Sequence, residues 1–166
     1  MRNNTRLLTT MAIFVAIGVI GSSILGFQIG VAKVYPIQHA VNVMAAVVLG
    51  PIPAVTIAFT IGLLRNLLGL GTLLAFPGGM IGALLAGYLY RWTKKKYMAA
   101  TGEMIGTGII GALFSVPYAN VLMGTSYGAL GFIPSFLASS ALGAVIGVLV
   151  LNRVNLENMV PKELRS

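Results

Sequence analysis

The chain has 166 residues, of which 57% are hydrophobic and 8% are charged, and its 11 Lys and Arg against 3 Asp and Glu give a net charge of +8. So few charged side chains cannot cover the surface of a soluble globule of this size, which excludes an ordinary soluble domain. The absence of cysteine excludes disulfides and thiolate metal sites, the single histidine (His39) excludes a multi-histidine metal centre, and the chain has no P-loop sequence for ATP.

Long apolar runs predict membrane-spanning helices, each of which needs about 20 mostly apolar residues, or about 17 at the short end. Pro51 and Pro53 break the chain after the second run, Pro117 predicts a kink in the fifth, and the glycine-rich residues 69–79 predict a loop. The fourth helix is expected to begin at residue 80 or a turn or two earlier. We therefore expect one domain over residues 1–166, an all-α membrane protein that forms a compact bundle of six transmembrane helices. These helices are predicted at residues 7–26, 37–49, 54–68, 80–90, 97–123 and 132–151.

Basic side chains lie at alternate ends of the predicted spans, which is the pattern of membrane topology. With six spans, Lys33 and Arg65 lie on one side, and the other nine Lys and Arg residues share the second side with both termini. By the positive-inside rule we expect a multi-pass protein of the cell membrane, surrounded by the lipid bilayer, with both termini in the cytoplasm. We expect no nucleic acid as a partner, because the bases do not follow one polar face. An uncleaved first helix is favoured over a signal peptide, whose removal would leave five spans. The nine Lys and Arg residues assigned to the cytoplasmic side are Arg2, Arg6, Arg91, Lys94, Lys95, Lys96, Arg153, Lys162 and Arg165.

Polar residues within the apolar runs are few, and we predict that they gather toward the outer side. Gln38 and His39 precede Asn42 by four and three residues, so these side chains share a helix face in the outer half of the second span. Polar groups inside a membrane usually face a cavity or one another, so this cluster predicts a pocket for a small, largely uncharged, aromatic molecule. The other candidates are Asn66 near the outer end of the third span, Tyr118 and Asn120 late in the fifth, and Gln28, Lys33, Tyr35, Phe76 and Tyr127 in the outer loops.

Each of these residues also has a structural interpretation. His39 is as readily a hydrogen-bonded structural histidine as a ligand contact, and Asn42 and Asn66 are suited to bridging helices. Arg65 is as readily a side chain that reaches the outer lipid headgroups. The convergence of several polar groups at one depth, and not any single residue, is the basis of the predicted pocket.

Glu103 is the single acidic residue within the apolar region. It follows the cytoplasmic start of the fifth span, so we predict an ion pair with Arg91 or Lys94 in preference to a role in proton coupling. On this topology His39 and Glu103 lie at opposite membrane faces and cannot form one active site. We therefore expect no enzyme and no cofactor or metal. The alternative is a membrane-embedded enzyme acting on a lipid or isoprenoid, with His39 as base or Glu103 as acid.

Two small residues four apart, Ala12 and Ala16, lie on the first predicted helix. Such spacing lets helix backbones approach closely in lipid. Taken alone, the pattern favours packing inside the bundle over a site for a partner helix, although the first helix is easily exposed at the edge of a bundle.

Three stretches of the sequence resemble a known family. They are Gln38-His39-x-x-Asn42-Val43 before Leu49-Gly50-Pro51, the run from Leu64-Arg65-Asn66 to Phe76-Pro77-Gly78, and Gly102-Glu103-x-x-Gly106-Thr107-Gly108. Together they resemble the thiazole-specific (ThiW-type) substrate-binding S components of energy-coupling factor (ECF) transporters. The resemblance extends over nearly the whole chain and implies a compact fold of six membrane helices.

The resemblance also implies a function and partners. An S component captures a vitamin or precursor outside the cell and associates with a membrane coupling subunit and two cytoplasmic ATPases. The family docks through an A-x-x-x-A motif on the first helix, which Ala12 and Ala16 match. The implied substrate is the thiamine precursor 4-methyl-5-(2-hydroxyethyl)thiazole. No acid is expected in the outer pocket, so cationic thiamine is less expected, and the only tryptophan, Trp92, is on the cytoplasmic side, so stacking would fall to Tyr or Phe. An S component for thiamine or another vitamin is the nearest alternative.

Overall fold

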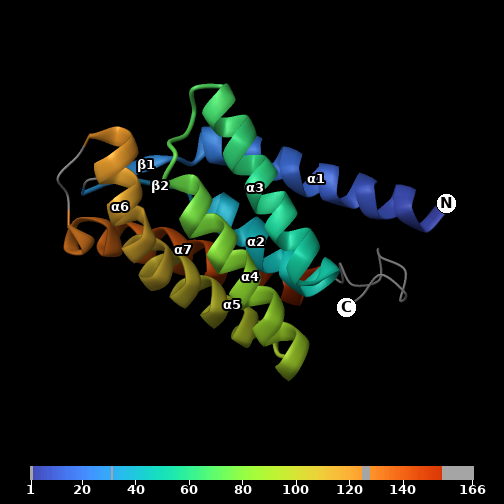
Figure 1. Ribbon diagram of the computed structural model, residues 1–166. Coiled ribbons are helices and arrows are strands. Elements are labelled where there is room, and N and C mark those ends of the chain that lie inside the picture. Colours follow the sequence, from blue (N-terminus) through green and yellow to red (C-terminus); the bar gives the residue numbers. More distant parts are fainter. Residues whose placement is uncertain (1, 31, 125–127, 155–166) are drawn as a thin grey trace.

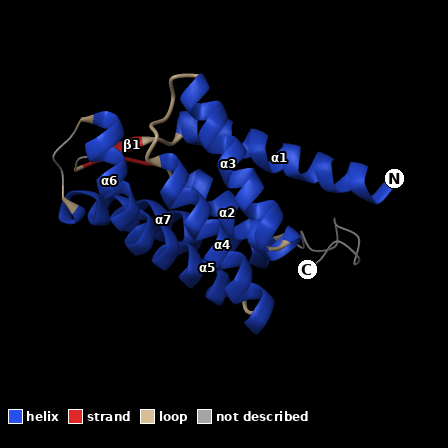
Figure 2. Cartoon of the chain, in the orientation of Figure 1, coloured by secondary structure: helices blue, strands red, loops and turns tan. Residues whose placement is uncertain are grey.

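The protein is almost entirely helical, as Figures 1 and 2 show for a computed structural model that describes residues 2–30, 32–124 and 128–154. The π-helix η1 joins α5 and α6 without a break, so the described residues form six helical rods with one short hairpin between the first two. The helices are α1 (Arg2–Ile24), α2 (Pro36–Leu49), α3 (Pro51–Leu67), α4 (Ala75–Thr93), α5 (Lys96–Ile105), η1 (Gly106–Gly111), α6 (Ala112–Met123) and α7 (Ala129–Arg153), and the strands are β1 (Phe27–Ile29) and β2 (Ala32–Val34).

Proline and glycine set the ends of the central helices. Pro36 and Pro51 occupy the first positions of α2 and α3, where the missing N–H is not needed for an intrahelical bond. Gly50, with φ of 85°, reverses the chain between them. The helix α4 begins at Ala75, within the turn or two allowed by the sequence, because Pro77 falls in its first turn, where proline is tolerated.

The short helix α2 lies at the centre of the bundle and packs against α1, α3, α4, α5 and α7 (Figure 1). Every residue of α2 except Ile37 is buried. Its valine and alanine side chains form the main apolar core together with Ile57 and Ile61 of α3 and Ala83 and Ala86 of α4. The polar residues at the start of α2 are therefore placed deep among neighbouring helices.

The outer surface of the bundle is apolar. Large side chains such as Leu130, Val121 and Ile24 are more than 70% exposed. A surface of this kind is disfavoured in water and suited to lipid. Three helical stretches, Asn4–Ile24, Lys96–Leu122 and Ala129–Arg153, are long and apolar enough to cross a membrane, and α2 and α3 are shorter apolar helices. The all-α membrane fold is thus confirmed, while the count of six spans stays a prediction.

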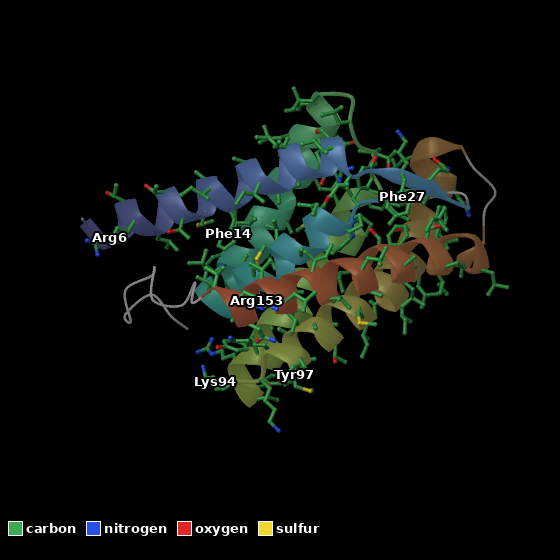
Figure 3. The ribbon with its side chains drawn as sticks, turned by 180° about the vertical axis from the view of Figure 1, so that it is seen from behind. Arg6, Phe14, Phe27, Lys94, Tyr97 and Arg153 are labelled. Carbon is green, nitrogen blue, oxygen red and sulfur yellow. The ribbon has the colours of Figure 1, made fainter. Side chains whose placement is uncertain are left out.

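Basic residues gather at one end of the bundle. Figure 3 shows Arg6, Lys94 and Arg153 at the end away from Phe27 and the hairpin. Lys96 at the start of α5 donates to the carbonyl of Leu151 near the end of α7, at 2.8 Å. The grouping agrees with the predicted base-rich side for these residues. The side chain of Arg2, together with Lys162 and Arg165, lies outside the described residues.

Candidate ligand-binding cavity

A cavity of about 250 Å³ lies at the hairpin end of the bundle. It is enclosed by elements far apart in the sequence: the hairpin, the start of α2, the end of α3 with the loop that follows, the start of α4, η1 and α7. Both polar and apolar groups are present, as in sites that bind small molecules. The lining residues are Gln28, Ala32, Lys33, Tyr35, Gln38, His39, Arg65, Gly69, Leu70, Gly71, Thr72, Leu74, Ala75, Gly78, Gly79, Thr107, Phe136 and Ser139.

Arg65 is the largest fully buried side chain, with 1% of its surface exposed. Its guanidinium carbon lies 3.6 Å from the centre of the Tyr35 ring, which is a cation–π geometry. Nη1 donates to Gln38 Oε1 and Nη2 to the Leu70 carbonyl at 3.3 Å, whereas the buried Nε has no acceptor among the residues that the structure describes. Because a guanidinium has five N–H donors, part of its hydrogen-bonding capacity is unused by the described residues.

A second polar cluster lies beside the cavity, around Glu103. The carboxylate oxygen Oε1 lies 2.7 Å from His39 Nδ1, 3.0 Å from Asn42 Nδ2 and 3.0 Å from Thr107 Oγ1. Glu103 and Asn42 are fully buried, and Asn42 Nδ2 also donates to the Gly79 carbonyl at 3.1 Å. His39 and Thr107 line the cavity, whereas Glu103 and Asn42 lie behind them.

Glycines allow α4 to approach this cluster. A Cβ on Gly82 would overlap Thr107 Oγ1 and lie 2.7 Å from Glu103 Oε2, and a Cβ on Gly106 would lie 2.7 Å from the Gly82 Cα. The π-helical turn η1 begins at this contact. Such turns insert an extra residue into an α-helix and occur often at functional sites.

The hairpin is held over the cavity by serines of α7. Ser139 Oγ accepts from the backbone N–H of Tyr35 at 2.8 Å, and Ser135 Oγ donates to the Ile29 carbonyl at 2.5 Å. These bonds fix the strand that leads into α2 and so position Tyr35 above Arg65. Within the described part of the chain, no three His or acidic side chains gather as a metal site would require.

Comparison with known families decides what kind of protein carries this cavity. A family model described as thiamine-precursor transporter protein (ThiW) matches residues 8–157, nearly the whole chain. The chain belongs to the ThiW family. Comparison with curated proteins and with solved structures gave no match. The ThiW match confirms the resemblance found in the sequence and makes this protein a member of a family of membrane transporters for thiamine precursors.

The ThiW-family structure brings only some of the predicted pocket residues together. Tyr35, Gln38 and His39 line the cavity, as do Gln28 and Lys33. Asn42 lies directly behind His39, bound to Glu103. Tyr127 lies outside the described residues.

Other predicted pocket residues lie away from the cavity lining. Asn66 Nδ2 donates to the Gly62 carbonyl and, at 3.0 Å, to that of Thr72, so it supports a lining loop from behind. Phe76 packs on Phe59 with ring centres 5.6 Å apart, and Tyr118 and Asn120 are exposed on α6. The prediction that Phe76, Tyr118 and Asn120 join the pocket is therefore wrong in its geometry. Helix rotation directs these side chains away from the cavity.

The predicted separation of His39 and Glu103 is also wrong. Glu103 bonds to His39, not to Arg91 or Lys94. On the predicted topology both residues lie near helix ends at opposite membrane faces. However, α2 has 14 residues and spans only about 21 Å, while Glu103 lies seven residues into α5, about two turns inside the bundle. The expectation of no acid at the pocket is corrected in the same way, because Glu103 lies immediately behind its wall.

Much of the cavity wall consists of residues that the sequence does not predict for the pocket. The sequence leaves Arg65 open between the site and the lipid headgroups, and the structure buries it in the site. Thr107, Phe136 and Ser139 also line the cavity. An arginine beside Asn66 at the end of an apolar run was a usable signal. Ser139, in contrast, lies among small residues of α7 that resemble ordinary helix packing.

Ala12 and Ala16 are exposed on α1. They line a shallow apolar groove between α1 and α3 together with residues such as Thr56 and Thr60. The opposite stripe of α1, with Phe14, Gly18 and Ser22, is the buried one, and a Cβ on Gly18 would contact Ile61 of α3. Packing inside the described bundle therefore does not account for Ala12 and Ala16.

Proposed function

We propose that this ThiW-family protein is the substrate-capture subunit of an ECF-type importer and that it binds 4-methyl-5-(2-hydroxyethyl)thiazole in the cavity beneath the hairpin. The observation that carries the proposal is the buried Arg65, stacked on Tyr35 and facing a cavity lined by Gln38 and His39. A thiamine-precursor transporter needs a site for a small aromatic ring with polar substituents, and this cavity offers one.

The cavity matches the parts of this molecule. The faces of Tyr35 and Phe136 suit a flat heteroaromatic ring. The ring nitrogen is a hydrogen-bond acceptor, and the unused donors of Arg65 are suited to it. The hydroxyl group of the ligand's hydroxyethyl side chain requires a hydrogen-bond acceptor or donor. The cavity wall offers four such side chains, Gln38, His39, Thr107 and Ser139.

Charge favours a neutral precursor over thiamine. Arg65 and Lys33 are positive groups of the cavity wall, whereas Glu103 lies behind it with Oε1 already engaged by three neighbours. Thiamine carries a permanent positive charge on its thiazolium ring, so its binding would place like charges close together. The buried Glu103 is nevertheless the one observation that keeps thiamine as a second candidate, and it is included in the test below.

The proposed topology has six membrane spans in the cell membrane, with the base-rich end and both termini in the cytoplasm and the cavity toward the outside. Support comes from the positions of Arg6, Lys94 and Arg153 at the end opposite the hairpin (Figure 3). The cavity would then receive its ligand from outside the cell.

Energy for uptake would come from partners, namely a membrane coupling subunit and two cytoplasmic ATPases, since the sequence has no P-loop. The proposed docking surface is the face of α1 that carries Ala12 and Ala16, which is exposed and small enough for close approach of a second helix. The protein itself would have no enzymatic activity.

The test has two parts. The purified protein is titrated calorimetrically with the hydroxyethylthiazole and with thiamine, and uptake of radiolabelled thiazole is measured in cells that express the chain with or without the coupling subunit and ATPases. We expect saturable binding of the thiazole, weaker binding of thiamine, and uptake only with the complete set. No binding of either compound would reject the proposal, and tighter binding of thiamine would transfer it to the second candidate.

A further inference from the structure

We infer that Glu103 is a positioning residue that fixes the single histidine, His39, with its Nε2 as the hydrogen-bond acceptor for the hydroxyl group of the ligand. The inference rests on the proposed function for the identity of the ligand, but its first test does not need a ligand. Glu103 does not line the cavity and would act only through His39.

The hydrogen-bond pattern identifies which atom donates. Asn42 Nδ2 faces two acceptors, the Gly79 carbonyl and Glu103 Oε1. The amide is therefore oriented with its nitrogen, and not its oxygen, toward Glu103. Oε1 therefore already accepts one hydrogen bond, and an ionised carboxylate oxygen can only accept. The remaining possibility for the 2.7 Å contact is that His39 Nδ1 donates and Oε1 accepts.

The second ring nitrogen is determined by the first. A neutral imidazole has one N–H donor and one acceptor, so a proton on Nδ1 leaves a lone pair on Nε2. His39 lines the cavity, and the described residues offer Nε2 no hydrogen bond. A ligand hydroxyl group that donates to Nε2 would fill this position.

Packing also holds the base of the His39 side chain in place. A Cβ on Gly143 of α7 would lie 2.5 Å from His39 Cβ, so α7 passes directly behind the histidine. On the other side, Thr107 Oγ1 lies 3.0 Å from both Glu103 Oε1 and the Gly78 carbonyl. Glu103 thus links α2 to η1 and lies close to Gly82 of α4. It does so beside His39, the residue that this inference assigns to the hydroxyl group.

The first test uses the fact that the chain has one histidine. Protein labelled with 15N-histidine, purified through a tag without histidine, gives one pair of imidazole signals. We expect a protonated Nδ1 and an unprotonated Nε2 in the wild type, and loss of this preference in Glu103→Ala. The control is Ser115→Ala, which removes a buried hydroxyl on the same helical rod away from the cavity and should leave both signals in place. A wild-type ring with its proton on Nε2, or on both nitrogens, would overturn the inference.

The second test measures ligand selectivity. The dissociation constants of the hydroxyethylthiazole and of its 5-ethyl analogue, which lacks the hydroxyl group, are compared for the wild type, Glu103→Ala and the shape-conserving Glu103→Gln. We expect a preference for the alcohol of about 10-fold in the wild type, falling to about 2-fold or less in Glu103→Ala and to an intermediate value in Glu103→Gln.

A purely structural Glu103 would weaken both ligands by the same factor and leave their ratio unchanged, which would overturn the inference. If Glu103→Ala does not fold, Glu103→Gln replaces it in both tests: its ratio of dissociation constants for the two ligands and its 15N spectrum are compared with those of the wild type. A wild type that binds neither ligand rejects the proposed function instead, and the 15N spectrum then judges the histidine arrangement alone.

Discussion

The helices α1 and α2 differ in how much of their surface is buried in the bundle. α1 has 23 residues, and its buried positions in the described part, Phe14, Gly18 and Ser22, form one narrow stripe. α2 has 14 residues, and all but Ile37 are buried. The long helix is thus held along one side, with the rest available to lipid or another protein, while the short helix is enclosed.

This difference explains where polar residues can be tolerated. Inside the bundle, Gln38, His39 and Asn42 of α2 each have hydrogen-bond partners, which offset much of the cost of removing polar groups from water. The described part of α1 from Met11 to Gly21 has no polar side chain at all. We therefore propose that ligand recognition belongs to the enclosed end of the bundle and partner recognition to the exposed face of α1.

The largest effect on stability is expected at Gly82, where the helices of the enclosed region are in closest contact. Gly82→Leu would force side-chain atoms into the space of Thr107 and Glu103, and we expect it to lower the free energy of unfolding by about 3 kcal/mol. Thermal unfolding in detergent measures the change. Gly128→Leu is the control, since among the described residues, its chain neighbours aside, no atom lies within 4 Å of a Cβ there. Equal melting temperatures for the two variants would show that α4 does not approach the Glu103 cluster so closely.

Arg65→Met tests the charged part of the cavity. The variant removes the guanidinium but keeps an unbranched side chain, and hydrogen bonds to charged groups contribute about 1.5–3 kcal/mol. We expect the affinity for the hydroxyethylthiazole to fall by about 10- to 100-fold. Calorimetry measures it, with Arg91→Met at the far end of α4 as the control. Unchanged affinity in Arg65→Met would remove Arg65 from the binding site.

Ala16→Trp, or equally Ala12→Trp, tests the exposed face of α1. A bulky side chain on the exposed face of α1 should prevent close approach of a partner helix and reduce uptake by at least about 10-fold, while ligand binding stays within about 2-fold. Val145→Trp, at an exposed position of α7, is the matched control and should leave uptake intact. Lost ligand binding in Ala16→Trp, with the transporter still assembling, would assign these alanines to packing within the bundle.

Asn66→Ala should have the smallest measurable effect. Its amide supports the Thr72 carbonyl and does not line the cavity, so its loss should loosen the wall and weaken ligand binding by only about 3-fold. Asn120→Ala, at an exposed position on α6, should have no effect on the same binding curve. An Asn66→Ala loss as large as that of Arg65→Met would indicate direct contact with the ligand.

The sequence predicted the helices well because proline, glycine and apolar runs act locally. Pro36 and Pro51 mark the starts of α2 and α3, and the predicted ranges differ from the observed ones mainly at the ends. The placement of Gln38 and His39 on a helix face shared with Asn42 also followed from helical spacing. The partner of Glu103 did not, because it depends on how far α2 and α5 are displaced along their axes, and local sequence does not encode that displacement. The outward direction of Tyr118 and Asn120 depends on helix rotation for the same reason.

The central claim is that the Arg65 cavity captures a thiazole. Equilibrium dialysis of the purified wild-type protein and of Arg65→Met against radiolabelled 4-methyl-5-(2-hydroxyethyl)thiazole tests it most directly. The account predicts saturable binding of one molecule per chain in the wild type and binding at least about 10-fold weaker in the variant. No saturable binding to the wild type, or equal binding by both proteins, would contradict it.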